Sequence, residues 1–342
     1  MDKKGFEIQF NWLFVLVAGA AILLFFGVII AKQKTVSDTS TKTTVLKSIE
    51  SIISSAGATT DTTKKENLPE TQIGISCNRV SIGGVSKNYQ NLILFAPDSI
   101  KGTKLIWQTL GFNSPYKITN FLYMDDGFTR YILVGDSNLA KDVNKSLSSQ
   151  LKKQLYKAAE VGDIKNENDQ KVVFMLFDYT GDANAQAMAF KNMPDSDAFK
   201  IAVDEIGNGY GKIDFYKKSG NVWGSKIGTS YFLGKASLVG ALYSHSPVTY
   251  SCNMQNAFKR MNSVSKVYIQ KTISLSSSLN ADCRKIYSDN MAAAGPLKSI
   301  SDNSQSAASG FSQDNVKFIA GSAKSLSDGN RQLQRLSCST IY

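Results

Sequence analysis

Apolar and polar positions divide the chain into regions of different periodicity. Residues 12–31 form an uninterrupted apolar run of 20 residues without a charged side chain. A helix of that length rises about 1.5 Å per residue and so spans the roughly 30 Å hydrocarbon core of a bilayer. Residues 71–248 carry short apolar runs typical of strands. From residue 249 onward apolar residues recur every three or four positions, as on amphipathic helices.

The first apolar run predicts a membrane anchor over residues 12–31, preceded by a short tail of residues 1–11. A secretory signal that is removed has a shorter apolar region and ends in small residues, whereas this run continues into GVIIAKQK. We therefore expect the anchor to stay in the lipid bilayer. The large residues expected to contact lipid are Trp12, Leu13, Phe14, Leu16, Leu23, Leu24, Phe25, Phe26, Ile29 and Ile30.

The sequence KKGF before the apolar run resembles the leader of type IV pilins and of archaeal pilin-like proteins. The resemblance covers about 27 residues and implies cleavage after Gly5 and assembly into a filament. The chain departs from the pattern at Phe10, where bacterial pilins have an acidic residue, and the polar Glu7, Gln9 and Asn11 delay the apolar run. Pilin-like processing and removal by signal peptidase therefore stand as alternatives to an uncleaved anchor.

Residues 32–70 predict a polar stalk. The stretches TVSDTSTKTT and GATTDTTKKENLPE are rich in threonine and poor in large apolar side chains, so they cannot bury a core. Between them, Val45, Ile49, Ile52 and Ile53 follow helical spacing, and Gly57 can end a helix. This segment is either a short amphipathic helix or a continuation of the anchor helix.

Residues 71–248 predict an α/β or α+β domain, because strand-like and helix-like segments alternate. Strands are expected at QIGISC, NLILFAP, KITNFLYM, RYILVG, KVVFMLFDY, GKIDFYKK and TSYFLGKASLVGALYS. Helices are expected at TKLIWQTLG, SNLAKDVNKSLSSQLKKQLYKAAEVG and DSDAFKIAVDEIG.

Residues 249–342 predict a helical region that ends in a hairpin. Gly295-Pro296 must break the first helix of this hairpin, and Gly310 marks the turn to the last helix. The fold class expected from the whole chain is thus a membrane-anchored α/β or α+β domain with a C-terminal helical hairpin.

The cysteines indicate on which side of the membrane the large domain lies. Cys77, Cys252, Cys283 and Cys338 are scattered, and with His245 as the single histidine there is no zinc-ligand spacing. An even number of separated cysteines beyond an anchor favours two disulfides in an oxidising compartment. Lysines flank both ends of the anchor, so charge does not decide its orientation. Four buried thiols in a cytoplasmic domain are the alternative.

The turn at Gly310 predicts how the cysteines pair. Cys283 lies 27 residues before it and Cys338 lies 28 residues after it, so an antiparallel helical hairpin brings the two sulfurs to the same end. Cys77 then pairs with Cys252. A sharp bend at Gly295-Pro296 would instead favour a bridge between Cys252 and Cys338.

The charge distribution excludes a nucleic-acid site. The chain of 342 residues has a net charge of +11, yet only six of its 39 basic residues are arginine and the lysines are scattered. Nucleic-acid sites show basic stripes with interleaved aromatic residues, which are missing here. A basic surface of this kind is compatible with attraction to anionic lipid or to an acidic cell-surface polymer.

Two short motifs have a catalytic appearance that their context does not support. YMDD at residues 123–126 resembles the metal-binding hairpin of reverse transcriptases, but it also reads as two apolar runs around an Asp-Gly turn. GNGYG at residues 207–211 is glycine-rich, but it is expected to follow a helix and precede a strand, the reverse of a dinucleotide-binding loop. Both are interpreted as turns.

The remaining catalytic patterns are equally weak. Ser149, Ser288 and Lys218 belong to elements that resemble those of penicillin-interacting serine enzymes, but their order along the chain is wrong. A Ser-His-Asp triad would have to use His245, which is better explained as a residue at the end of a strand. The sequence therefore predicts no catalytic, metal-binding or cofactor-binding residue, and no cofactor.

Three stretches, GFEIQFNWLFVLVAGAAILLFF, LILFAPDSIKG and YSCNMQNAF, resemble uncharacterised archaeal proteins with one N-terminal membrane helix and an external domain. This resemblance implies no known activity. We expect a non-enzymatic, single-pass membrane protein whose extracytoplasmic domain binds a protein partner at the cell envelope or builds an envelope structure. The alternatives are a pilin-like filament subunit and an anchored hydrolase in which Asp, Ser and His245 converge in a pocket. The oligomeric state is not predicted.

Overall fold

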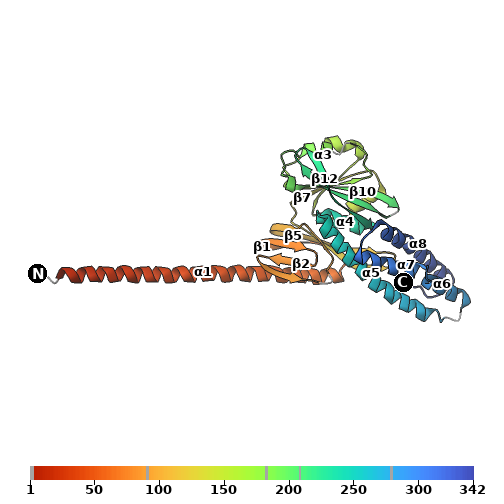
Figure 1. Ribbon diagram of the computed structural model, residues 1–342, viewed down its shortest axis with the longest axis horizontal. Helices are drawn as coiled ribbons and strands as arrows, with labels where there is room; N and C mark the ends of the chain where they lie inside the picture. The colour runs from red at the N-terminus through yellow and green to blue at the C-terminus, as the bar shows by residue number, and fades with distance from the viewer. Residues whose placement is uncertain (1–3, 90–91, 182–183, 208, 278–279) are drawn as a thin grey trace. The chain divides into compact units, whose positions relative to one another are not determined.

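The computed structural model describes residues 4–89, 92–181, 184–207, 209–277 and 280–342, and for residues 4–14, 29–39, 41 and 185 it describes the backbone alone. The chain divides into two compact units, residues 1–50 and 51–342. Helix α1 (Lys4–Ala58) runs without a break for 55 residues (Figure 1). Of the two readings of residues 45–57, the continuation of the first helix is thus correct.

The expected anchor segment lies within α1. The side chains of Trp12, Leu13, Phe14, Ile29 and Ile30 lie outside the described residues. The described side chains Leu16, Leu23, Leu24, Phe25 and Phe26 are between 56% and 74% exposed. Among the residues that the structure describes, no helix is both long enough and apolar enough to cross a membrane.

The first sheet has the strand order β3-β2-β1-β5-β6-β4, and all neighbours are antiparallel except β4 and β6. The strands are β1 (Thr63–Ser76), β2 (Arg79–Ile82), β3 (Val85–Asn88), β4 (Leu94–Phe95), β5 (Ser99–Asn113) and β6 (Lys117–Asp125). Residues 63–70, expected in the polar stalk, form the first part of β1, and residues 63–67 pair with β5 before a shift of register. Main-chain pairing does not require apolar side chains.

The second sheet has the order β12-β11-β10-β9-β7-β8. Its strands are β7 (Thr129–Val134), β8 (Lys152–Tyr156), β9 (Lys171–Phe177), β10 (Ala198–Gly207), β11 (Tyr210–Ser219) and β12 (Val222–Leu233). Strands β8, β7, β9 and β10 are parallel, whereas β11 and β12 are antiparallel additions. All six residues of β7 are buried, as expected for a parallel strand covered on both faces.

Short helices connect the parallel strands. They are α2 (Asn138–Ser146) between β7 and β8, the 3₁₀ helix η1 (Ala158–Asp163), α3 (Asn184–Ala189) and the 3₁₀ helix η2 (Asp195–Asp197). The sequence assigned one long helix to the segment that forms α2, β8 and η1, and this assignment is wrong. Leu147 already leaves the helical backbone, so the leucines spaced by four do not share one helix.

The α/β class is confirmed, but three further segments have the opposite structure to the one expected. TKLIWQTLG lies in β5, where residues 105–110 are all buried, and AFKIAVDEIG is the parallel strand β10 rather than a helix. Conversely, the expected strand GKASLVGALYS is helix α4 (Gly234–Ser244). Residues 236–244 of α4 are buried on every side, so no alternation of apolar and polar positions marks it as a helix.

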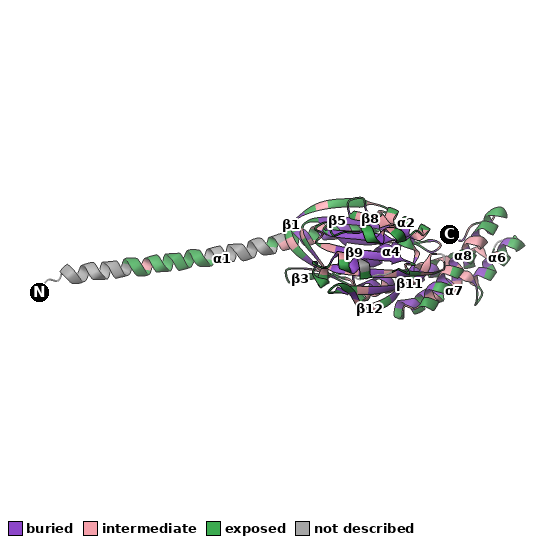
Figure 2. Cartoon of the chain, turned by 90° about the horizontal axis from the view of Figure 1, so that it is seen from above, coloured by how far each residue is buried: buried purple, intermediate pink, exposed green. Residues whose placement is uncertain are grey.

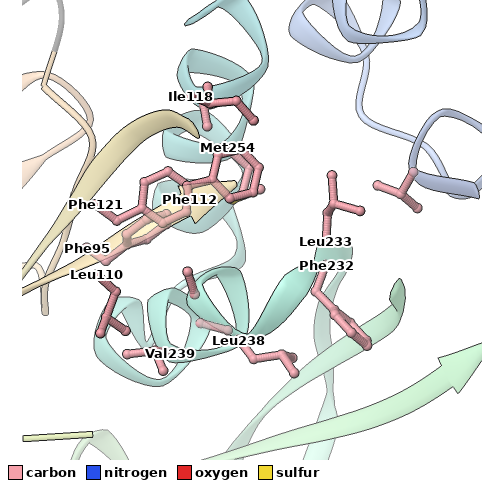
Figure 3. Packing of buried hydrophobic residues seen from close by; sticks show 14 of the residues in the cluster. Phe95, Leu110, Phe112, Ile118, Phe121, Phe232, Leu233, Leu238, Val239 and Met254 are labelled. Carbon is pink, nitrogen blue, oxygen red and sulfur yellow. The ribbon is translucent and has the colours of Figure 1, made fainter. Parts of the chain in front are cut away.

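Helix α4 packs between the two sheets. It contacts β4, β5 and β6 of the first sheet and β12 of the second. Figure 2 shows α4 in the colour of buried residues. Leu238 and Val239 of α4 lie among side chains from both sheets, including Leu110 and Phe232 (Figure 3). A Cβ atom at Gly240 would lie 2.8 Å from the ring of Phe95, so the close approach requires glycine.

The C-terminal region consists of α5 (Pro247–Leu275), α6 (Ala281–Met291), α7 (Pro296–Ser309) and α8 (Gln313–Arg335) (Figure 1). Pro296 begins α7 and Gly310 separates α7 from α8, as expected. The break at Gly295-Pro296 divides the first arm of the expected hairpin into α6 and α7. Helix α7 packs against both α5 and α8.

Two disulfides join elements that are far apart in the sequence. Cys77, after β1, pairs with Cys252 in α5, and Cys283 in α6 pairs with Cys338 after α8; both Cα–Cα separations are 6.0 Å. This is the pairing expected from the sequence. The first bridge connects the first sheet to the helical region, and the second fixes the C-terminal segment, where the side chain of Ile341 is fully buried.

Removing either disulfide is expected to lower the free energy of unfolding. The bridges span 175 and 55 residues, and the chain-entropy account assigns them about 5 and about 4 kcal/mol, respectively. Chemical denaturation of Cys77→Ser/Cys252→Ser and of Cys283→Ser/Cys338→Ser measures each loss. An unchanged denaturation midpoint in either variant would contradict a stabilising bridge at that place.

Candidate functional site

The YMDD motif forms a turn between the two sheets. Because β6 belongs to the first sheet and β7 to the second, the turn transfers the chain rather than closing a hairpin. Asp125 accepts hydrogen bonds from the Gly127 amide (2.5 Å) and the Tyr131 hydroxyl (2.6 Å), and Asp126 accepts one from the Phe128 amide (3.0 Å). Burial, with Asp126 adjacent, raises the pKa of Asp125 to about 6. Both carboxylates thus stabilise the turn.

The other catalytic patterns are not assembled into a site. Residues 207–211, of which 208 lies outside the described residues, connect β10 to β11, so the expected order of helix and strand is wrong. Lys218 is buried and its ammonium contacts Asp195 (2.7 Å), while Ser149 follows α2 and Ser288 lies in α6. Within the described ranges, no cluster of three or more His, Cys, Asp or Glu residues could hold a metal ion.

His245 occupies an unusual position at the C-terminal end of α4. Its φ angle of 53° places it in the left-handed region, where helix ends favour glycine. The imidazole stacks on Phe199 of β10, with ring centroids 5.0 Å apart and an interplanar angle of 25°. Its Nε2 atom is buried and has no hydrogen-bond partner among the described residues. A strained backbone and an unsatisfied buried nitrogen together mark a candidate site.

A cavity of about 370 Å³ lies beside His245. It is lined by residues from the segment before β5, from β9, β10, β11 and η2, and from the junction between α4 and α5. The polar and charged residues among them are Asp98, Ser99, Lys171, Ser196, Asp197, Lys217 and Ser246. Asp, Ser and His245 therefore line one pocket, as expected for an anchored hydrolase.

The serines of this cavity are not arranged for nucleophilic attack. The Ser246 hydroxyl accepts a hydrogen bond from the Thr249 amide, and the Ser99 hydroxyl accepts one from the Gln72 side chain. The Ser196 hydroxyl donates to Asp197. In the part of the chain that the structure describes, no serine hydroxyl is hydrogen-bonded to His245, as a catalytic triad requires.

The electrostatics of the cavity also weaken His245 as a base. Burial, with a contribution from the nearby Lys171 ammonium, lowers the pKa of the imidazole from 6.5 to about 3. The ring is thus neutral at physiological pH, and its low basicity makes it a poor acceptor of a serine proton. A neutral imidazole beside two lysines and two aspartates suits the binding of a polar ligand better than acyl transfer.

The sequence predicted His245 as a residue at the end of a strand, which is wrong because it caps helix α4, and it did not predict the surroundings of the imidazole. Asp98, Lys171, Phe199 and Lys217 lie on separate elements and share no spacing that would connect them. Comparisons with protein families, with curated proteins and with solved structures found no match to this chain. The chemistry of the site therefore follows from its geometry alone.

The lowered pKa of His245 predicts a specific dependence of stability on pH. In the unfolded chain the imidazole protonates near pH 6.5, whereas in the fold it stays neutral down to about pH 3. The unfolded state thus binds more protons in this window, and stability falls as pH decreases. Between pH 7.5 and 4.5 the wild type should lose about 3 kcal/mol more than His245→Asn.

Asparagine is the matched substitution because it tolerates the left-handed backbone. The substitution removes the stacking on Phe199 at every pH and so lowers stability by a constant amount. Only the way in which the difference in unfolding free energy between the two proteins varies with pH reports on the imidazole. Urea denaturation of both proteins across this range is the measurement. Parallel stability curves would show that His245 is not held neutral.

Proposed function

We propose that this chain is a single-pass membrane protein, anchored through residues 12–31, whose large domain lies outside the cytoplasm. The observation that carries the proposal is the pairing of all four cysteines in the unit that follows the apolar run. Disulfides persist in oxidising compartments and are rare in the cytosol. A domain with two of them is best explained on the outer side of the membrane.

The apolar side chains of the first helix support the anchor. Residues 12–31 contain no charge, and the described Leu23, Leu24 and Phe25 are between 64% and 74% exposed in the isolated chain. Consecutive exposed side chains of this size require another apolar environment to cover them. Lipid supplies it, with Trp12 at the headgroup level.

We assign to the external domain a binding or structural role at the cell envelope rather than a reaction. The weakly basic His245 and the engaged serines beside it support this assignment. The domain offers cavities with fixed polar groups, which is what recognition of a partner or ligand needs.

A filament subunit is the second candidate, and the continuity of α1 favours it. The pilin-like leader implies cleavage after Gly5, which would place the new N-terminus at Phe6, inside the uninterrupted helix of 55 residues. A helix that is apolar at its free end and continues into a folded domain can pack with copies of itself. The mass of the N-terminal peptide separates the two candidates: a peptide beginning at Phe6 supports the filament, and an intact N-terminus supports the anchor.

Protease treatment of intact cells or spheroplasts tests the location. Residues 35–342 should be degraded without lysis, while a fragment containing the anchor stays protected by the bilayer. A cytoplasmic protein that survives the same treatment is the control for cell integrity. Protection of the large domain until lysis would reverse the orientation.

A further inference from the structure

A second cavity, of about 450 Å³, lies in the unit of residues 51–342 and is separate from the His245 pocket. Residues before and at the start of β1, the middle of β5, the segment between α2 and β8, and the first turn of α4 line it. Its volume lies in the range that accommodates a small ligand. Its walls carry hydroxyl groups from several serine and threonine residues and three lysines.

The charge of this cavity is positive. Lys145, Lys153 and Lys235 line it and only one carboxylate, that of Asp61, opposes them. Lys145 and Lys235 are exposed and form no ion pair with the residues that the structure describes. Lys235 also lies in the first turn of α4, where the helix dipole favours an anion. The cavity therefore attracts a negatively charged group.

The ammonium group of Lys153 is held in a fixed position on the wall of the cavity, where it can donate a hydrogen bond. Its ammonium donates to the carbonyl oxygens of Asn144 (2.7 Å) and Leu147 (2.5 Å), at the C-terminal end of α2. These two bonds fix the nitrogen and leave one of its three protons for another acceptor. Burial lowers the pKa of Lys153, so an anion that approaches it stabilises the charged form.

Gln108 requires a hydrogen-bond donor from the ligand, whereas the lysines require an acceptor. Its side chain is buried, and its Nε2 donates to the Ser146 carbonyl oxygen (3.2 Å). Because that carbonyl can only accept, the orientation of the amide is fixed and Oε1 is left as an acceptor. Oε1 is buried and has no partner within the described residues. A ligand that satisfies it must bring a hydrogen-bond donor as well as a negative charge.

We propose that this cavity binds an acidic sugar, in which a carboxylate contacts Lys145, Lys153 and Lys235 and a hydroxyl donates to Gln108. Hydroxyl groups on the same sugar find partners on Thr63 and Ser149, two exposed wall residues whose hydroxyls form no hydrogen bond with the described residues. The proposed ligand extends the binding role assigned above. It rests on that role only for the location, the cell envelope, in which the protein would encounter an acidic sugar. Binding itself is measured on purified protein, so its failure leaves the membrane topology untouched.

The experiment is calorimetric titration of the full chain in a polyoxyethylene detergent, which has no sugar headgroup. Digalacturonate should bind, and its affinity should fall with added salt. Neutral galactobiose, which lacks the charge, and adipate, which lacks the hydroxyls, should each bind at least tenfold more weakly. Inorganic phosphate that binds as tightly as digalacturonate, or equal affinity for all three organic ligands, would overturn the proposal.

Substitutions locate the site. Lys145→Gln and Lys235→Gln should each raise the dissociation constant about five- to tenfold, as expected for the loss of one charge-assisted contact. Lys141→Gln is the matched control, because Lys141 is an exposed lysine on the same helix as Lys145 but does not line the cavity. Equal weakening by Lys141→Gln would show attraction to the general basic surface and refute a built site. Unchanged thermal unfolding midpoints verify that each variant is folded.

Discussion

The burial of α4 on all sides is the constraint on which the domain depends. Nine consecutive residues of this helix are buried, and it separates the largely antiparallel first sheet from the largely parallel second one. Its main chain is fixed from outside as well: the Tyr123 hydroxyl of β6 donates to the Ala236 carbonyl oxygen at 2.8 Å. Because residues 236–244 have no exposed face, the helix cannot rotate or slide without breaking contacts with both sheets, so it determines how they pack.

The same helix positions both cavities, one at each end. Lys235 in its first turn contributes to the lysine-lined cavity, and His245 at its C-terminal cap contributes to the other. The left-handed backbone of His245 ends α4 and allows α5 to begin at Pro247, two residues later. The two sites therefore share one rigid support, and a substitution that loosens α4, such as one at Gly240 against Phe95, should disturb both.

Sequence patterns predicted the C-terminal helices and the buried strands β7 and β9, but they missed helix α4 and the strands β5, β8 and β10. The amphipathic spacing of the C-terminal helices and the breaks at Pro296 and Gly310 were readable because each helix has a solvent face. Residues 236–244 of α4 and 105–110 of β5 are buried on every side, so no alternation of exposed and buried positions distinguishes a helix from a strand there. Lys145 and Lys235 are far apart in sequence, and only the packing of α2 on α4 explains why they meet.

The way the chain uses its ionisable groups supports the binding role proposed for the domain. Buried charged side chains form internal contacts that stabilise the fold. Arg130 is fully buried and pairs with Asp169 at 2.9 Å. Asp125 accepts a hydrogen bond in the turn between the sheets. His245 is kept neutral by its surroundings. Lys145 and Lys235, which line an open cavity, form no ion pair within the described ranges, in a chain with a net charge of +11. Because their positive potentials add, the lysines of this cavity favour the binding of a group of opposite charge.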